Sequence, residues 1–333
     1  CDLPPVHTVA FITSDGDNIQ LLQHADFMDD KHYSSPLRGS IPVGWSYSPA
    51  MAALMPSLLA AVRANLTAND SLSAGPSGAG YAYPSQFTSA QADAFGRVTA
   101  ALMAEAGQSI VNVIGVSPSA ESLLPLLRAA TPSAKPAAIV YLTFGAARMG
   151  YAGLHGNVAY LDGTPVVGAR LSLWGDATSG DKVGVDGLVN ELQTLPKDPT
   201  NPNSYSIIVS ELGNGYKPLV DAANQLQALG GFEVVLPEEL ISRMVSRTRG
   251  AAQCPLPSGS WSRTCGDLQR CSIAGNGSCV FTCESIKHGL LAPLPRRASC
   301  DLHECTNLTL GTVGGRLRFL CDGKRPCPEG GRK

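Results

Sequence analysis

The sequence lacks several features that define common protein classes. No stretch approaches about 18 uninterrupted apolar residues, so no membrane-spanning helix is predicted. Charged residues make up 16% of the 333 residues, the net charge is -2 and no long basic stripe occurs, so a nucleic-acid partner is not expected. The GxSxG, HExxH and P-loop patterns are also absent, so none of the reactions that they mark is indicated.

Cysteine is scarce over most of the chain and dense near its end. Nine of the ten cysteines fall between Cys254 and Cys327, and Cys1 is the other. Dense cysteines in a small polar segment are typical of a disulfide framework in an oxidising compartment. Zinc is the alternative, but spacings such as Cys265-x5-Cys271 lack the paired CxxC pattern of zinc sites. Disulfides are therefore favoured.

Two further features fit a secreted protein. Four N-x-S/T sequons occur, at Asn65, Asn69, Asn276 and Asn307. The sequence starts with Cys1 rather than Met, which fits a lipid-anchored mature N-terminus or a fragment of a longer gene product. We expect an extracellular location, with surface anchoring as a variant of it.

Residues 1–247 alternate between short apolar runs and amphipathic stretches. The runs are β-branched and too short for helices, whereas the stretches between them repeat apolar residues with the 3.6-residue helical period. The predicted strands are residues 7–13, 41–46, 70–75, 109–115, 137–144, 165–174, 204–210 and 232–236. The predicted helices are residues 51–66, 89–107, 119–130, 186–195, 217–229 and 237–248. This order predicts an α/β fold, a (β/α) barrel of about seven strands, rather than an open sheet.

The pattern changes near residue 248. Residues 248–258 are rich in Gly, Pro and Ser, which predicts a linker. Residues 259–323 show no helical period, only cysteines, glycines and short β-like pieces, and predict a small disulfide-rich β module. Residues 324–333 are expected to form a disordered tail.

The sequence SDGDN, residues 14–18, follows the first predicted strand, where a β/α barrel carries its chemistry. Asp15 and Asp17 lie two residues apart, so an extended chain places both carboxylates on one side. Gly16 permits a tight turn or the close approach of a ligand. Two other interpretations are open: Asp17 or Asn18 could cap the following helix, or the motif could be a calcium loop, although it lacks the closing glutamate.

As acid–base groups, Asp15 and Asp17 would repel each other, and together they could hold one water molecule. They are too close to straddle a glycosidic bond, which needs carboxylates about 5 Å apart in retaining enzymes and about 6.5–9.5 Å apart in inverting ones. A third acid is therefore needed. The candidates near predicted strand ends are Asp70, Asp176 and Glu211, with surface solvation or helix capping as the alternative for each.

Aromatic residues near other strand ends suit a sugar ligand. In residues 75–87, Tyr81 and Tyr83 follow three glycines that include Gly80, which permits close approach of a ligand. Tyrosine rings pack on the C–H faces of sugars while nearby acids accept their hydroxyl groups. Trp45 and Trp174 are further candidate platforms, with core packing as the alternative. His155 is a weaker candidate proton donor.

Residues 78–84 spell GxGYxYP, and the chain resembles the GxGYxYP family of glycoside hydrolases over roughly residues 6–247. The resemblance includes SDGDN, residues 69–78, residues 169–175 and the closing VLPEEL. It implies a seven-stranded β/α barrel that follows an N-terminal repeat domain, with the active site between the two. It also implies an acidic cluster in which Asp15 and Asp17 join a glutamate N-terminal to the barrel. The sequence begins 14 residues before Asp15 and shows no counterpart of that glutamate.

The tail resembles one repeat of a cyanovirin-N homology domain, a small β-rich lectin. The resemblance rests on GSWSRTC (259–265), CVFTC (279–283), SCDL (299–302) and GGRLRFLC (314–321). One repeat is visible, stretched by residues 290–297, and it implies a carbohydrate-binding module. Such a module would keep an adjoining enzyme on its polymer.

We therefore expect a secreted glycoside hydrolase that acts on a poly- or oligosaccharide, with Asp15 and Asp17 positioning and deprotonating the attacking water. The expected substrate-binding residues are Asn18, Trp45, Gly80, Tyr81, Tyr83, Trp174 and Glu211. No metal or organic cofactor is required. The alternative is a non-catalytic carbohydrate-binding protein with a degenerate barrel, and a weaker third option is a metal-dependent hydrolase that uses the aspartate pair.

Overall fold

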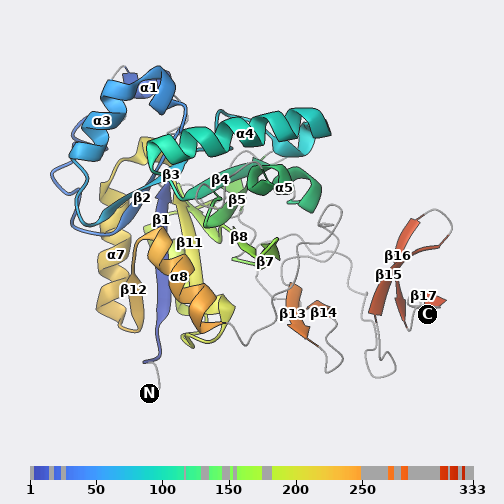
Figure 1. Cartoon of the computed structure of the whole chain (residues 1–333). Helices are drawn as coiled ribbons and strands as arrows, with labels where there is room; N and C mark the ends of the chain where they lie inside the picture. The colour runs from blue at the N-terminus through green and yellow to red at the C-terminus, as the bar shows by residue number, and fades with distance from the viewer. Residues whose placement is uncertain are drawn as a thin grey trace.

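The computed structural model shows a mixed α/β domain followed by short tail strands (Figure 1). The residues that it describes are 4–14, 19–23, 28–115, 118–128, 135–144, 151–152, 156–174, 182–248 and the tail strands 269–273, 279–283, 308–313, 316–321 and 325–326.

A curled, largely parallel sheet forms the centre of the domain. Its successive neighbours are β1 (His7–Thr13), β2 (Val43–Tyr47), β3 (Asp70–Ala74), β4 (Ile110–Gly115) and β5 (Ala138–Phe144). On the edge opposite to β2, β1 pairs in parallel with β11 (Tyr205–Ser210). The last pair of partners is Thr13 and Ser210. The order follows from buried, β-branched runs that alternate with helices, and it confirms the α/β part of the predicted fold. The sheet is curled, and the barrel of about seven strands remains a prediction.

The segment 164–173 joins the two ends of this sheet. β8 (Thr164–Gly168) pairs in parallel with β5, and β9 (Leu171–Leu173) pairs in parallel with β11. Between them the Ala169 N–H donates to the Tyr141 carbonyl (3.0 Å) and the Arg170 N–H donates to the Ile207 carbonyl (2.8 Å). The predicted single strand 165–174 is therefore two strands, because the segment changes its hydrogen-bonding partner at Ala169–Arg170.

Four shorter strands extend the sheet. They are β6 (Tyr151–Ala152), β7 (Val158–Leu161), β10 (Lys182–Val183) and β12 (Phe232–Val234), which pair with β5, β8, β9 and β1 respectively. β7 and β8 form an antiparallel hairpin whose turn residues Asp162 and Gly163 both have positive φ, as a two-residue primed turn requires. The Asp-Gly pair is the sequence signal for this hairpin, which the strand prediction missed.

The helices follow the predicted periodicity closely. They are α1 (Ile19–Gln23), α2 (Met51–Leu54), α3 (Pro56–Ala64), α4 (Ser89–Ala106), α5 (Ala120–Arg128), α6 (Val185–Gln193), α7 (Lys217–Leu229) and α8 (Pro237–Arg247), with 3-10 turns at Pro84–Gln86, Pro202–Ser204 and Leu212–Asn214. The predicted helix 51–66 is two helices because Pro56, which has no N–H to donate, starts a new one. α4 begins with a capping box between Thr88 and Gln91.

Alternate strand residues build separate cores on the two faces of the sheet. On one face Val9, Phe11 and Ile208 pack with residues of α6 and α7. On the opposite face an inner cluster joins the sheet to α8. Besides Ala169, which lies between β8 and β9, its members from the strands are Ala10, Ile12, Ile110, Ile114, Ala138, Val140, Leu142, Val167, Tyr205, Ile207 and Val209. Leu240, Ile241 and Met244 of α8 cover that cluster. Two-residue alternation thus assigns β1 and β11 to both clusters.

The described tail strands are antiparallel. β13 (Gln269–Ile273) pairs with β14 (Cys279–Cys283), and β15 (Leu308–Val313) pairs with β16 (Arg316–Cys321), which in turn pairs with β17 (Arg325–Pro326). β17 falls within the segment expected to be a disordered tail. The disulfide framework and the lectin-like unit remain predictions. Across the described part of the chain, no helix combines the length and apolarity needed to cross a bilayer.

A buried polar network ties β1 to β11. His7 is fully buried; its Nδ1 lies 2.8 Å from the Pro196 carbonyl and its Nε2 lies 2.8 Å from the Ser206 hydroxyl. The Arg170 guanidinium donates to the same hydroxyl (2.6 Å). Burial lowers the pKa of His7 to about 4, with smaller contributions in the same direction from Arg170 and Lys197. The imidazole is therefore neutral in the folded protein at neutral pH.

This depressed pKa predicts an acid-sensitive fold. Below its ordinary pKa of 6.5, His7 gains a proton in the unfolded chain before the folded chain does, so stability is complete above pH 6.5 and declines as pH falls towards about 4. The expected loss is about 3 kcal/mol. Urea unfolding of the wild type and His7→Gln between pH 7 and 4 measures it. Equal pH dependence in the two proteins would contradict the assignment.

Candidate functional site

The carboxyl end of β1 is fixed between two neighbouring strands. Ser14 is buried, and its N–H donates to the Ser210 carbonyl at the end of β11 (2.7 Å). Thr13 accepts a hydrogen bond from the Ser46 N–H near the end of β2 (3.0 Å). The SDGDN motif therefore leaves the sheet between the ends of β11 and β2. Asp15, Asp17 and Asn18 lie outside the described residues, as do Asp176 and His155.

Glu211 follows β11 at the same edge of the sheet. Its N–H donates to the Leu173 carbonyl at the end of β9 (3.1 Å), and its carboxylate Oε1 accepts a hydrogen bond from the Gly213 N–H (2.9 Å). Glu211 also lines a narrow recess with Thr13, Trp45, Ser210, Gly215, Tyr216 and Leu219. Of the three candidate third acids, Glu211 is the one that the described structure places at the carboxyl edge.

The glycine-rich loop before α4 is held in place by Ser77, which is fully buried. Its hydroxyl accepts a hydrogen bond from the Ile114 N–H of β4 (2.9 Å) and donates to the Ala82 carbonyl (2.7 Å). Its own N–H donates to the Gly80 carbonyl (2.9 Å). The Ser77 side chain therefore links the two sides of the loop and binds the loop to the end of β4. Nothing in the sequence pattern marked Ser77.

Thr99 of α4 holds the opposite side of the same loop. Its hydroxyl accepts a hydrogen bond from the Ala79 N–H (3.1 Å). Gly78 has φ +105°, and a Cβ there would lie 2.4 Å from the Thr99 methyl group, so glycine is required. The loop is thus fixed by contacts to both β4 and α4.

The loop presents Tyr81 and Tyr83 as an aromatic pair. Their ring centroids lie 5.9 Å apart at 76°, and their hydroxyl oxygens are 3.4 Å apart. Tyr81 is 50% exposed, and a Cβ on Gly80 would meet open space. Tyr83 is partly buried against the inner cluster, as is Trp174. The structure therefore brings Tyr83 and Trp174 to one cluster and leaves the Tyr81 ring accessible.

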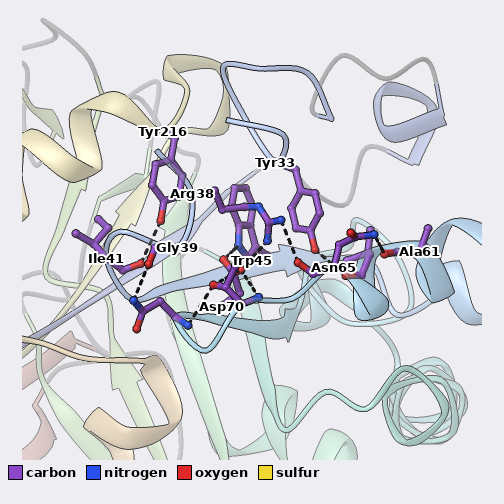
Figure 2. Close-up of polar contacts among 12 residues, drawn as sticks. Tyr33, Arg38, Gly39, Ile41, Trp45, Ala61, Asn65, Asp70 and Tyr216 are labelled. Carbon is purple, nitrogen blue, oxygen red and sulfur yellow. Dashed lines mark hydrogen bonds and ion pairs between the residues drawn. The ribbon is translucent and has the colours of Figure 1, made fainter. Parts of the chain in front are cut away.

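Trp45 belongs to the core, which is the alternative that the sequence left open. It is 1% exposed; Tyr216 stacks on it at 5.9 Å and 17°, and Tyr33 packs edge-on at 5.1 Å. Its indole N–H donates to Asp70 (2.8 Å), as Figure 2 shows. Burial raises the pKa values of Tyr33 and Tyr216 to about 12, so both hydroxyls stay protonated. Trp45 therefore offers no open face to a sugar.

Asp70 is a structural anion and not a third acid of the site. It is the first residue of β3, at the amino end of the strand, and its side chain is fully buried. It forms an ion pair with Arg38 (2.6 Å), whose side chain lies beside it in Figure 2. It also accepts hydrogen bonds from the N–H and the hydroxyl of Thr67. The Asp70 carboxylate therefore has its ion-pair and hydrogen-bond partners within the fold, and the interpretation of Asp70 as a catalytic acid is corrected.

A metal centre has no support among the residues that the structure describes, because none of them form a group of three or more His, Cys, Asp or Glu side chains suited to an ion. The metal-dependent alternative rests on Asp15 and Asp17, which lie outside them.

Replacement of Asp70 by Asn should destabilise the protein by about 3–5 kcal/mol, because it leaves the Arg38 charge without its partner. Denaturant unfolding measures the change. Asp162→Asn is the matched control: the Asp162–Lys135 pair is exposed and should contribute at most about 1 kcal/mol. Similar losses in the two variants would contradict the structural role of Asp70.

Ser77→Ala should loosen the tyrosine loop, because it leaves the Ile114 N–H and the Ala82 carbonyl without their partner. The expected loss of stability is about 1–3 kcal/mol. Hydrogen exchange should quicken in residues 77–87 and 110–115. Ser246→Ala, which removes an exposed hydroxyl from α8, should leave exchange there unchanged. Unaltered protection in Ser77→Ala would show that other contacts hold the loop.

The solved structures that are similar to this chain include a hydrolase and an amylase. A crystal structure of a putative hydrolase from Bacteroides thetaiotaomicron superposes with a TM-score of 0.62 at 22% identity, covering 74% of this chain and 46% of that one. An exo-type maltose-forming amylase from Pyrococcus sp. matches with a TM-score of 0.45 at 12% identity, over 77% of this chain and 53% of that one. The first shows a shared fold, and this chain spans less than half of that relative.

The sequence comparisons are of two kinds. Among curated proteins, none matches this chain. The model of the GxGYxYP putative glycoside hydrolase C-terminal domain matches residues 5–244, which is well over half of the 333 residues and close to the range expected from the motifs. The chain therefore belongs to the GxGYxYP putative glycoside hydrolase C-terminal domain family.

Proposed function

We propose that this chain carries the barrel domain of a secreted glycoside hydrolase, which cleaves a poly- or oligosaccharide at the carboxyl edge of its sheet. The observation that carries the proposal is the meeting of two family motifs at that edge. SDGDN begins directly after β1, and the tyrosine loop is stapled to the end of β4 by Ser77. We treat the curled sheet as a barrel of seven strands closed through the segment 164–173.

In the proposed reaction Asp15 and Asp17 hold the attacking water and remove its proton. The oxygen of that water bonds to the anomeric carbon while the bond from that carbon to the glycosidic oxygen breaks. The leaving oxygen takes a proton from a third acid and departs as an alcohol. Tyr81 and Tyr83 line the subsite beside this bond. The mechanism draws on carboxylates alone.

In this proposal, the third acid is supplied by another part of the whole protein. The family resemblance places a glutamate N-terminal to the barrel, and this chain spans 46% of the length of the Bacteroides relative. We propose that the acidic cluster is completed at the edge where the SDGDN motif leaves the sheet. The tail module then keeps the enzyme on its polymer, which raises the local substrate concentration without adding catalytic contacts.

A non-catalytic carbohydrate-binding function is the second candidate. The observation that favours it is the tyrosine pair, which is preformed and accessible and which needs no acid to hold a sugar ring. The two functions differ in whether Asp15 and Asp17 catalyse the cleavage of a glycosidic bond or only contact a ligand.

Replacing both Asp15 and Asp17 with Asn in the full-length parent should lower polysaccharide hydrolysis by roughly 100- to 10,000-fold, because it removes the proposed general base. Reducing-end release from a panel of polysaccharides measures the rate, and Asp162→Asn, at the exposed β7–β8 turn, should match the wild type.

Hydrolysis that survives the double substitution would remove the catalytic assignment. The carbohydrate-binding function holds instead if the wild type binds glycans, the double variant binds them more weakly, and neither protein cleaves any glycan. Loss of hydrolysis in the presence of a strong chelator would favour the metal-dependent alternative.

A further inference from the structure

The backbone pairing between β1 and β4 is sparse at two places near the carboxyl edge of the sheet. β2 pairs with β3, and β4 with β5, along the whole of β2 and β4. By contrast, the pairing of β1 with β2 ends at Ile12 and Gly44, and β3 pairs with β4 at Ala74 and Val111 alone, although the structure describes all four strands completely. Both places lie between the SDGDN motif, which follows β1, and the tyrosine loop, which is bound to β4.

Side chains bridge both of these places. Beyond the last backbone pair of β1 and β2, the Ser46 N–H donates to the Thr13 hydroxyl oxygen (3.0 Å). Between β4 and its neighbours, Asn112 donates from Nδ2 to the hydroxyl oxygens of Ser46 on β2 (2.8 Å) and Ser73 on β3 (3.0 Å). Side-chain hydrogen bonds therefore connect the strands where their backbones do not pair.

Gln108, which precedes β4, makes a second bridge to the same two strands. Its Nε2 donates to the carbonyls of Tyr47 (2.8 Å) and Ser73 (3.0 Å). These bonds end on backbone carbonyls. Asn112 instead bonds two side-chain hydroxyls, and it lies within β4, the strand that holds the tyrosine loop.

Asn112 makes its bonds in the interior of the domain. Asn112 and Ser73 are fully buried, and Ser46 is buried as well. Ile110 and Ile114, which share a face of β4 with Asn112 by two-residue alternation, belong to the inner cluster. Hydrogen bonds are electrostatically stronger in such surroundings than in water, and their loss leaves buried polar groups without partners. The contacts of Asn112 are therefore costly to break.

These bonds form one link from the tyrosine loop to the strand that carries SDGDN. The Ser77 hydroxyl holds the loop at the Ile114 N–H. Asn112, two residues earlier in β4, bonds the Ser46 hydroxyl, and the Ser46 N–H bonds Thr13. We infer that Asn112 is a positioning residue that fixes the tyrosine loop relative to the start of SDGDN. The inference rests on the proposed function, in that the two motifs form one site.

Hydrogen exchange of the full chain tests this link without reference to hydrolysis. Asn112→Ala should raise exchange about 10-fold both in residues 77–83 and in residues 10–14, because each end loses its connection to the other. Ser46→Ala should do the same, since it removes the hydroxyl acceptor and keeps the N–H that bonds Thr13. Ser71→Ala, which removes another serine hydroxyl from the same face of β3 as Ser73, is the matched control and should match the wild type.

Steady-state kinetics of the full-length parent tests the consequence for the reaction. Asn112→Ala should lower kcat about 10- to 100-fold, because a misplacement of about 1 Å can cost roughly 100-fold in rate. It should change KM by less than about threefold, since the tyrosine pair is retained. Adding Ser46→Ala should lower kcat no further, because both substitutions break the same link. Ser71→Ala should again match the wild type.

Thermal unfolding of each variant fixes a temperature at which all of them are folded. If Asn112→Ala fails to fold, Ser46→Ala supplies both measurements. Wild-type exchange at either end of the link would overturn the inference, as would a wild-type kcat or fully additive losses in the double variant. A parent that hydrolyses no polysaccharide would refute the proposed function instead, and exchange would still decide whether Asn112 links the two motifs.

Discussion

The parallel pairing of β1 on both of its edges is the constraint on which the arrangement of this site depends. β11 pairs with one edge from Thr8 to Thr13, and β12 and β2 share the other. Parallel strands end at the same side of a sheet, so the residues that follow Thr13, Ser210 and Tyr47 must emerge together. The register alone therefore decides which loops surround the SDGDN motif.

The same pairing depends on the segment 164–173, which bonds to both β5 and β11. The segment 164–173 can serve both β5 and β11 only by changing partner at Ala169–Arg170, and the buried Arg170 side chain then bonds the Ser206 hydroxyl of β11. Burial lowers the pKa of Arg170 to about 10, so the cation persists at neutral pH. A buried charge is tolerated only where polar groups surround it, and here the Tyr205 carbonyl (3.4 Å) adds to the hydroxyl. Polar contacts thus hold the segment 164–173 at the point where it changes partner, and they restrict it to one register.

The sequence predicts the parts of this structure that local chemistry determines. Strands and helices were placed well because apolar spacing is a local signal, and SDGDN and Glu211 were placed at strand ends for the same reason. The sequence keeps Asp70 among the candidate acids because its partner Arg38 is 32 residues away, and no local pattern shows which end or face of a strand a residue occupies. The role of Ser77 depends on its hydrogen bonds to Ile114 and Ala82, which leave no periodic signal in the sequence.

The order of the strands places the tyrosine loop close to the start of the SDGDN motif. Only β2 lies between β1, which SDGDN follows, and β3, which precedes the tyrosine loop. The tyrosine loop is anchored to β4 and α4, so little ordering entropy would be lost if it bound a ligand. In the proposed reaction, binding energy gained at this loop can be used to hold the scissile bond against a reacting group at the end of β1.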